Sequence, residues 1–236
     1  MEVLRGKRTY TMDGDELAAL VQGYSEVLLD IGTGDGRLVR HLALADARCL
    51  VVGIDACREN LRVTSRRSPP NALFVAANAL ALPAELAGLA GWAGINFPWG
   101  SLLQGLLDGE PSLLRGLRAI GRPGARLEVR LNGGALTEAG WPLQEGSLRV
   151  RDVLQDAGFG MRDVRELDAG ALRRLQTTWA RRLAHGRDPR GMELLAVRSA
   201  PRAGTSGAPS GGPGSSAGAI RGSLSSSPDA ASGDPS

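Results

Sequence analysis

The chain has 236 residues and a formal net charge of +3, a value too close to neutral to indicate a partner by itself. Its two cysteines, Cys49 and Cys57, and two histidines, His41 and His185, form neither a disulfide framework nor a metal-ligand cluster by their spacing. No apolar run reaches membrane-spanning length and the N-terminus has no signal-peptide pattern, so we expect a soluble, cytoplasmic protein without a membrane or metal partner.

The composition changes near Pro201. From there to Ser236 almost every residue is Ser, Gly, Ala or Pro, and the only large apolar side chains are Ile220 and Leu224. Such a segment cannot bury enough apolar surface to offset the entropy of ordering it. We therefore predict a disordered tail over 201–236 and a single folded domain over 1–200, of which residues 1–24 are an N-terminal extension.

Taken in chain order, the first eleven residues are mixed in composition and predict a small hairpin or an arm. A helix is expected from Asp13, where Glu16 completes a capping-box pattern, to about Gln22. Apolar runs and helical patterns then alternate. Strands are predicted over 27–31, 49–54, 73–76, 94–97, 126–131, 161–167 and 194–198, and helices over a stretch ending at Leu44, 59–67, 102–107, 111–120, 148–157 and 172–183.

Strands that alternate with helices form a parallel sheet with helices on both faces. Seven strands, with antiparallel returns at the end of the chain, fit one variant of that architecture. The predicted fold class is α/β, the class I (Rossmann-like) methyltransferase fold with a seven-stranded, mostly parallel sheet.

The strongest motif is the run Asp30-Ile31-Gly32-Thr33-Gly34-Asp35-Gly36, which follows the first buried strand and opens a helix. Open α/β sheets bind ligands at this position, and glycines allow the backbone to approach a ligand closely. Dinucleotide enzymes need a further glycine where this chain has Arg37. An acid before the turn and another inside it would repel a pyrophosphate but suit the ammonium group of a methionyl moiety. The turn therefore favours S-adenosylmethionine over NAD, with a ligand-free turn as the remaining alternative.

The ends of the next strands extend the candidate cofactor site. Asp55 is placed to accept both ribose hydroxyls, and Asn78 is placed to read the adenine edge, although an asparagine taken alone is more often a turn residue. The residues predicted to bind the cofactor are Asp30, Gly32, Thr33, Gly34, Asp35, Gly36, Asp55, Ala56, Asn78, Ala79, Phe97, Pro98 and Ser101.

Two tryptophans are candidates for holding the methyl acceptor. Trp99 follows the fourth strand, where an aromatic ring can stack on a flipped-out base, although a core tryptophan is the alternative. Trp179 lies among arginines, an unusual setting for a buried ring. Between Arg173 and Arg198 there are seven arginines against two acids, which indicates either a phosphate-binding face or a solvated helix face.

The sequence resembles the aminoglycoside-resistance 16S rRNA (adenine(1408)-N(1))-methyltransferases of the Kam/Npm family. The resemblance covers about residues 1–200 in order and is most specific where Pro-Trp-Gly-Ser-Leu-Leu is combined with a distal Trp-Ala-Arg-Arg-Leu. It is carried by Gly6-Lys7-Arg8, the glycine turn, Phe97-Pro98-Trp99-Gly100-Ser101-Leu102-Leu103, Thr178-Trp179-Ala180-Arg181-Arg182-Leu183 and Arg187-Asp188.

The resemblance implies methyl transfer from S-adenosylmethionine to N1 of the decoding-site adenine of 16S rRNA in the 30S subunit, with aminoglycoside resistance as the result. It implies that Trp99 and Trp179 are the catalytic residues that sandwich this adenine. A ribosome-docking enzyme of this kind is expected to be a monomer. The residues implied to bind RNA are Lys7, Arg8, Arg62, Arg66, Arg67, Thr177, Arg182 and Arg187.

Other functions remain open at this point. Adenine N1 carries an in-plane lone pair, so its methylation needs positioning and no general base. N6-type amino methyltransferases carry Asn/Asp-Pro-Pro-aromatic, which Asn96-Phe97-Pro98-Trp99 resembles except at Phe97. A small-molecule methyltransferase would not need the arginine cluster, and a non-enzymatic ribosome-binding module would bind the cofactor without turnover.

Overall fold

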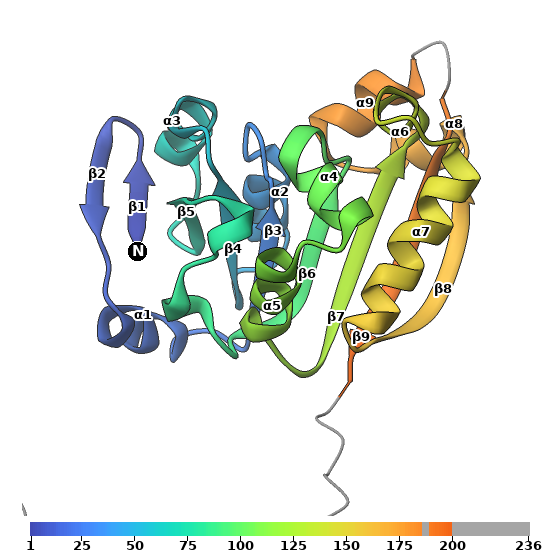
Figure 1. The fold of residues 1–236 in the computed structure, drawn as a ribbon. Coiled ribbons are helices and arrows are strands. Elements are labelled where there is room, and N and C mark those ends of the chain that lie inside the picture. The colour runs from blue at the N-terminus through green and yellow to red at the C-terminus, as the bar shows by residue number, and fades with distance from the viewer. Residues whose placement is uncertain (186–188, 200–236) are drawn as a thin grey trace, which may run out of the picture. The chain divides into compact units, whose positions relative to one another are not determined.

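The computed structural model describes residues 1–185 and 189–199, and Figure 1 shows their arrangement. The tail predicted over 201–236 and the predicted RNA-binding residue Arg187 lie outside the described residues.

The described residues form one nine-stranded sheet with the order β2-β1-β5-β4-β3-β6-β7-β9-β8. Strands β5, β4, β3, β6 and β7 are parallel to one another, whereas β9 is antiparallel to both β7 and β8. The strands span Glu2–Arg5 (β1), Arg8–Thr11 (β2), Glu26–Ile31 (β3), Cys49–Asp55 (β4), Ala72–Ala76 (β5), Ala90–Asn96 (β6), Gly121–Asn132 (β7), Phe159–Leu167 (β8) and Gly191–Arg198 (β9).

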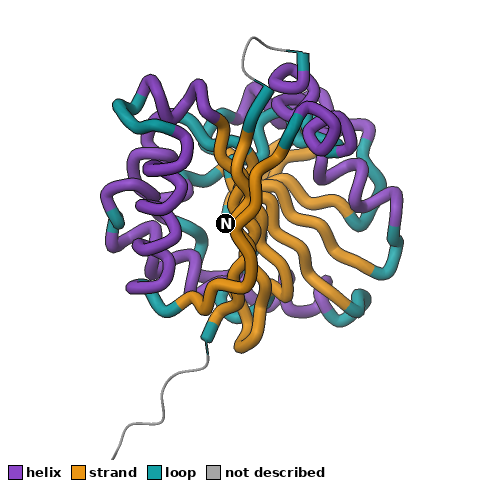
Figure 2. The backbone as a smooth tube through the Cα atoms, turned by 90° about the vertical axis from the view of Figure 1, so that its right-hand side faces the viewer, coloured by secondary structure: helices purple, strands orange, loops and turns teal. Residues whose placement is uncertain are grey.

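Helices cover both faces of the sheet, as the view along it in Figure 2 shows. Successive residues of β4 point to opposite faces of the sheet, and both faces are apolar. Leu50 and Val52 belong to one apolar cluster and Val51 belongs to another, so both faces need to be covered by helices. The helices span Gly14–Val21 (α1), Arg37–Ala45 (α2), Arg58–Arg67 (α3), Gly100–Asp108 (α4), Pro111–Ile120 (α5), Gly133–Glu138 (α6), Leu143–Asp156 (α7), Ala169–Arg174 (α8) and Thr178–Ala184 (α9), with short 3-10 helices at Ala79–Ala81 (η1) and Ala84–Leu86 (η2).

All seven predicted strands are present as β3 to β9, and the predicted fold class is confirmed. The prediction of seven strands was incomplete, because the first eleven residues form the hairpin β1–β2 and join the sheet at its edge. Val3 pairs with Val75 of β5, and the side chains of Val3 and Leu4 are buried. The hairpin thereby covers the edge of β5, which would otherwise expose unpaired backbone groups.

The single helix predicted over 172–183 is wrong, because the chain forms two helices there. Helix α8 ends at Arg174, and Thr177 begins α9 by accepting a hydrogen bond from the Ala180 N–H to its hydroxyl at 2.9 Å. A threonine that caps a new helix competes with continuation of the old one. The break places Trp179 in the first turn of α9. The helix predicted over 148–157 also begins earlier, at Leu143, and α6 precedes it.

Gly36 lies between the glycine turn and α2, directly before the first residue of the helix. Its φ of +69° is left-handed, and a Cβ there would lie 2.5 Å from Cε1 of the buried Phe74. A glycine at this position therefore serves the packing of α2 on the sheet in addition to the backbone conformation.

We expect Gly36→Ala to destabilise the fold more than a matched control, Gly88→Ala. Gly88 has a φ of +72°, and no heavy atom lies within 4 Å of the place that a Cβ would occupy. Alanine there meets only the left-handed penalty of about 1–2 kcal/mol. At Gly36 the collision with Phe74 adds about 1–3 kcal/mol. Urea unfolding of the two variants measures the difference, and equal losses of unfolding free energy would contradict this account of Gly36.

Candidate functional site

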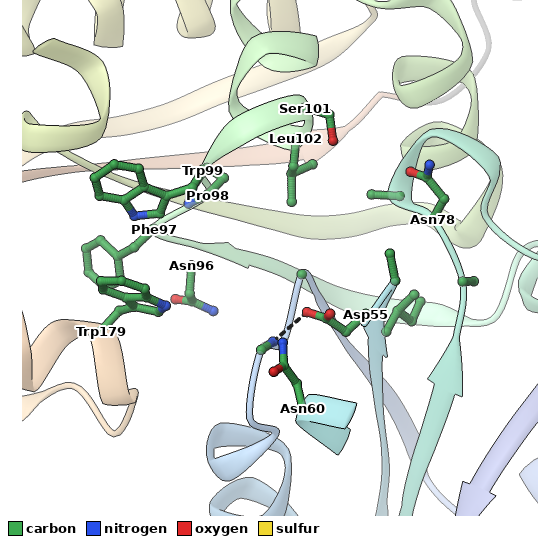
Figure 3. A pocket seen from close by; sticks show the side chains of 16 residues that line it. Asp55, Asn60, Asn78, Asn96, Phe97, Pro98, Trp99, Ser101, Leu102 and Trp179 are labelled. Carbon is green, nitrogen blue, oxygen red and sulfur yellow. Dashed lines mark hydrogen bonds between the residues drawn. The ribbon is translucent and has the colours of Figure 1, made fainter. Parts of the chain in front are cut away.

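A cavity of about 380 Å³ opens where the parallel strands β3, β4, β5 and β6 end, and Figure 3 shows it from close by. A second cavity of about 270 Å³ adjoins it and shares Gly32, Gly34, Asn60, Asn96 and Trp179 with it. The carboxyl edge of a parallel sheet is where such folds bind ligands. The first cavity is further lined by Ile54, Asp55, Ala56, Ala77, Asn78, Ala79, Phe97, Pro98, Trp99, Ser101 and Leu102, and the second by Asp30, Thr33, Asp35, Leu38, Thr177, Thr178 and Arg182.

The structure brings twelve of the thirteen residues predicted to bind the cofactor to these two cavities. Gly36 is the exception, since it lies outside both and packs against Phe74. The regular spacing of the three glycines gave no means of separating one that meets a ligand from one that meets a core side chain.

Asp55 ties the glycine turn to the loop after β4. One of its carboxylate oxygens accepts from the Gly34 N–H at 2.8 Å, and the other accepts from the Cys57 N–H at 2.8 Å. Each carboxylate oxygen has capacity for a further hydrogen bond. Asp55 is thus held in place by the backbone while it keeps acceptor capacity toward the first cavity, which it lines (Figure 3).

Asp30 is the buried acid of the site, with 2% of its surface exposed. Burial raises its pKa to about 6, while hydrogen bonds from the Thr33 hydroxyl at 2.5 Å and the Asn96 side-chain amide at 3.0 Å act in the opposite direction. A desolvated carboxylate that keeps only two donors is well suited to a cationic ligand group in the adjoining cavity.

A chain of buried and half-buried polar groups continues from Asn96 across the sheet. The Asn96 carbonyl oxygen accepts from Arg130 Nη1 at 2.8 Å, and Arg130 donates through Nε to Glu193 Oε1 at 2.7 Å and through Nη2 to Glu128 Oε2 at 2.7 Å. Arg165 also donates to the Glu193 carboxylate, at 2.6 Å through Nε. Because arginine can only donate, the Asn96 oxygen faces Arg130 and its NH₂ group faces the glycine turn.

Trp99 and Trp179 face each other at one end of the first cavity, and Figure 3 shows the two indole rings one above the other. Their ring centroids are 5.9 Å apart with planes inclined by 33°, and the Arg182 guanidinium lies 5.3 Å from the Trp179 ring. The side chains are 38% and 40% exposed, so neither is a core tryptophan. Two half-exposed rings beside a cation form a surface on which a planar base can stack.

The turn that carries Trp99 is shaped by Phe97. Phe97 has a φ of +54°, rare for a residue with a side chain, and its N–H donates to the Arg130 carbonyl at 2.7 Å. Its ring is buried against Leu172 and Ala180 of α8 and α9. The same residue therefore anchors both segments that present the tryptophans.

One protein family matches nearly the whole of the described chain. The family model of NpmA, 16S rRNA (adenine(1408)-N(1))-methyltransferase, matches residues 2–198. The chain belongs to this family. Named members with curated functions include the Escherichia coli enzyme, 33% identical over 205 residues that cover 79% of this chain and 94% of that protein, and the Streptoalloteichus hindustanus enzyme, 36% identical over 199 residues that cover 78% and 92%.

Solved structures of family members are also similar. The 16S rRNA methyltransferase KamB has a TM-score of 0.77 and 33% identity, covering 85% of this chain and all of KamB. A variant of the Catenulisporales acidiphilia 16S rRNA (adenine(1408)-N(1))-methyltransferase, solved with its cosubstrate SAM, has a TM-score of 0.75 and 31% identity, covering 86% and 98%. The family predicted from the Pro-Trp-Gly-Ser-Leu-Leu and Trp-Ala-Arg-Arg-Leu runs is thus confirmed.

The residues that the family resemblance implied for RNA lie in three places. Lys7 and Arg8 lie at the turn of the β1–β2 hairpin, which contacts α3 through a hydrogen bond from the Gly6 N–H to the Ser65 hydroxyl at 2.9 Å. Helix α3 carries Arg62, Arg66 and Arg67, and Arg182 and Thr177 belong to α9 and its cap. No helix among residues 1–185 and 189–199 is long and apolar enough to cross a membrane.

Sequence reasoning did not identify Asn60, Asn96 or Thr178 as site residues. Asn96 ends β6 beside the glycine turn, a position that could have indicated its role. The Thr178 hydroxyl donates to the Asp35 carboxylate at 2.7 Å and so joins α9 to the glycine turn, although the two residues are 143 positions apart. A contact at that separation leaves no local pattern.

Asp30 makes stability depend on pH in a definite direction. Its pKa in the folded chain, about 6, is above the usual value of about 3.9 in an unfolded chain. Such a group stabilises the fold most below about pH 4, and this contribution is lost as the pH rises through the folded value. Asp30→Asn resembles the protonated carboxyl. We expect wild-type unfolding free energy to fall relative to the variant by about 2–3 kcal/mol between pH 4 and pH 7.

Urea unfolding at a series of pH values measures this difference directly, because the other titrating groups are common to both proteins. A gap between the two proteins that stays constant with pH would show that burial does not perturb the Asp30 carboxyl.

Proposed function

We infer that the chain transfers the methyl group of S-adenosylmethionine to N1 of adenine 1408 of 16S rRNA in the 30S subunit, which confers aminoglycoside resistance. The observation that carries this conclusion is the pair Trp99–Trp179, two half-exposed rings that face each other at one end of the first cavity in a chain of this methyltransferase family. The expected partner is the 30S subunit, reached in the cytoplasm by a monomer.

The polar groups that line the two cavities fit S-adenosylmethionine. We assign the ribose hydroxyls to Asp55, the adenine edge to Asn78 and Ala79, and the methionyl ammonium to the Asp30 end of the second cavity. Ser101 and Pro98 border the first cavity on the side of α4. When bound, this cofactor supplies a methyl group already activated by its sulfonium charge.

The residues of the chain act by positioning. The described lining of both cavities contains no histidine, cysteine, lysine or tyrosine, and its carboxylates, Asp30, Asp35 and Asp55, already accept hydrogen bonds from other groups of the chain. Adenine N1 needs no general base, because its lone pair is available in the ring plane. Holding that plane between Trp99 and Trp179 directs N1 toward the cavity, and Arg182 over the Trp179 ring adds a contact for phosphate.

The two tryptophan rings are too close together for a base to stack between them without some movement. Stacked bases lie about 3.4 Å apart, so a base between two rings needs about 7 Å. The rings are 5.9 Å apart and inclined by 33°. Trp99 and Trp179 must therefore separate by about 1 Å and become more parallel when the adenine enters. Since Trp179 lies in the first turn of α9, a small shift of that helix is sufficient.

An N6-type amino methyltransferase is less compatible with this site. Such enzymes need the asparagine of the motif to hold the exocyclic amine. The Asn96 oxygen accepts from Arg130 and its NH₂ group donates to Asp30, so its side chain is engaged on both sides. The family is also the basis for proposing that RNA is bound by Lys7, Arg8, Arg62, Arg66, Arg67, Thr177, Arg182 and Arg187, with Arg182 and Arg187 on phosphates.

The clamp predicts a graded loss of methylation. Trp99→Ala and Trp179→Ala should each lose stacking of about 1–3 kcal/mol, which corresponds to about a 5- to 150-fold slower transfer. Trp99→Phe and Trp179→Phe keep an aromatic face and should retain much more activity. Tritium transfer to 30S subunits, free 16S rRNA and free adenosine, followed by mass spectrometry of the nucleosides, measures both the rate and the product.

Melting temperatures of the four variants show whether each one is folded. Alanine variants that are folded and as active on 30S subunits as the wild type would contradict the clamp. N6-methyladenosine as the product, or labelling of free adenosine alone, would contradict the proposed reaction.

A further inference from the structure

A third cavity, of about 440 Å³, lies between α2, α3 and the segment that joins α8 to α9. It shares Thr177 and Thr178 with the second cavity, so the two adjoin at the start of α9. Its described lining contains no carboxylate. The lining residues are Arg37, Arg40, His41, Leu44, Val63, Thr64, Arg67, Gln176, Thr177, Thr178 and Arg181.

Three of the four arginines that line this cavity form no ion pair with a carboxylate of the described residues. Arg37 is paired with Asp35 at 3.3 Å, but within the described part of the chain Arg40, Arg67 and Arg181 have no carboxylate within 4 Å. Three guanidinium groups around one concave surface produce a local positive potential that attracts phosphate.

Two of these arginines are held in orientation by neutral acceptors. Arg40 Nε donates to the Arg67 carbonyl at 3.2 Å, and Arg181 Nη2 donates to the Gln176 side-chain oxygen at 3.1 Å. A neutral partner fixes the guanidinium without cancelling its charge, and the remaining N–H groups can still donate. Less side-chain entropy is then lost when a phosphate binds.

The cavity also has an apolar side. Leu44 is 58% exposed and Val63 is 70% exposed, and both line it. Exposed aliphatic side chains next to these arginines match a ligand that presents both phosphate and a less polar sugar or base. A nucleic-acid strand has this combination, whereas an isolated phosphate ion or an acidic peptide has only part of it.

We propose that this cavity, here called the α2–α3 basic cavity, binds the rRNA strand that carries the target adenine, with Arg40, Arg67 and Arg181 on its phosphates. The proposal rests on the proposed function and extends its RNA-binding surface to α2, which no residue predicted from the sequence had reached. The shared residues Thr177 and Thr178 place the cavity next to the segment that carries Trp179. The strand can therefore be held in this cavity while its base enters the adjacent clamp.

The test compares charge reversals in the cavity with a matched reversal elsewhere. Arg40→Glu and Arg181→Glu should weaken binding to 30S subunits by 10-fold or more at moderate salt. The dependence of log affinity on log salt should become shallower by about 0.7–0.9 for each phosphate that the variant no longer neutralises. The control is Arg115→Glu on α5, an exposed arginine beside a different cavity, which should change 30S binding less than 2-fold.

Affinity for S-adenosylmethionine, measured by calorimetry, should stay the same in all three variants, which shows that each is folded and that the cofactor cavity is intact. Arg40→Gln removes the charge without reversal and should give a smaller loss of 30S binding. If Arg40→Glu and Arg181→Glu keep their cofactor affinity and bind 30S subunits like Arg115→Glu, the basic cavity does not bind rRNA. A wild-type protein that binds the cofactor but leaves 30S adenine unmethylated would instead contradict the proposed function.

Discussion

The hydrogen-bonded chain from Asp30 through Asn96 and Arg130 to Glu193 connects neighbouring strands under the carboxyl edge of the sheet. Asp30 and Glu193 are 2% and 1% exposed, so each carboxylate is stable there only with its partners in place. Removing one partner of such a buried pair costs about 3–5 kcal/mol because a charge is left uncompensated. The site therefore depends on Arg130, which satisfies Glu193 and orients the Asn96 amide at the same time.

The same arginine also fixes the turn that carries Trp99. Its side chain holds Asn96 and its backbone carbonyl accepts from the Phe97 N–H, so the last residue of β6 and the first residue of the turn are both fixed to β7. The left-handed conformation at Phe97 then presents Trp99 at the cavity. On the other side, the hydrogen bond from Thr178 to Asp35 holds the start of α9, and with it Trp179, against the glycine turn. The first cavity and the pair of tryptophans are thus parts of one hydrogen-bonded frame.

Local pattern was sufficient to predict the parallel strands and the glycine turn, because buried apolar runs and a turn at a strand end are visible in short windows of sequence. The role of Arg130 was not, because a charged residue within a strand is usually exposed, and two of the partners that hold the half-buried Arg130, Asn96 and Glu193, lie 34 and 63 residues away. The break before Thr177 was missed for a similar reason, since apolar and basic residues continue through it at helical spacing while a single cap decides the outcome. The two tryptophans were candidates from their positions and their neighbours, and the family resemblance implied that they sandwich one base.

Primer extension on 16S rRNA from cells that express the chain tests the central claim most directly. N1-methyladenine cannot form a Watson–Crick pair, so reverse transcriptase should stop at adenine 1408 in cells with the wild-type chain and read through in cells with a folded chain that lacks both clamp tryptophans. The stop should accompany aminoglycoside resistance in the same cells. A stop at a guanine of the decoding site, or full resistance without a stop at adenine 1408, would contradict the assignment of adenine N1 as the methylated atom.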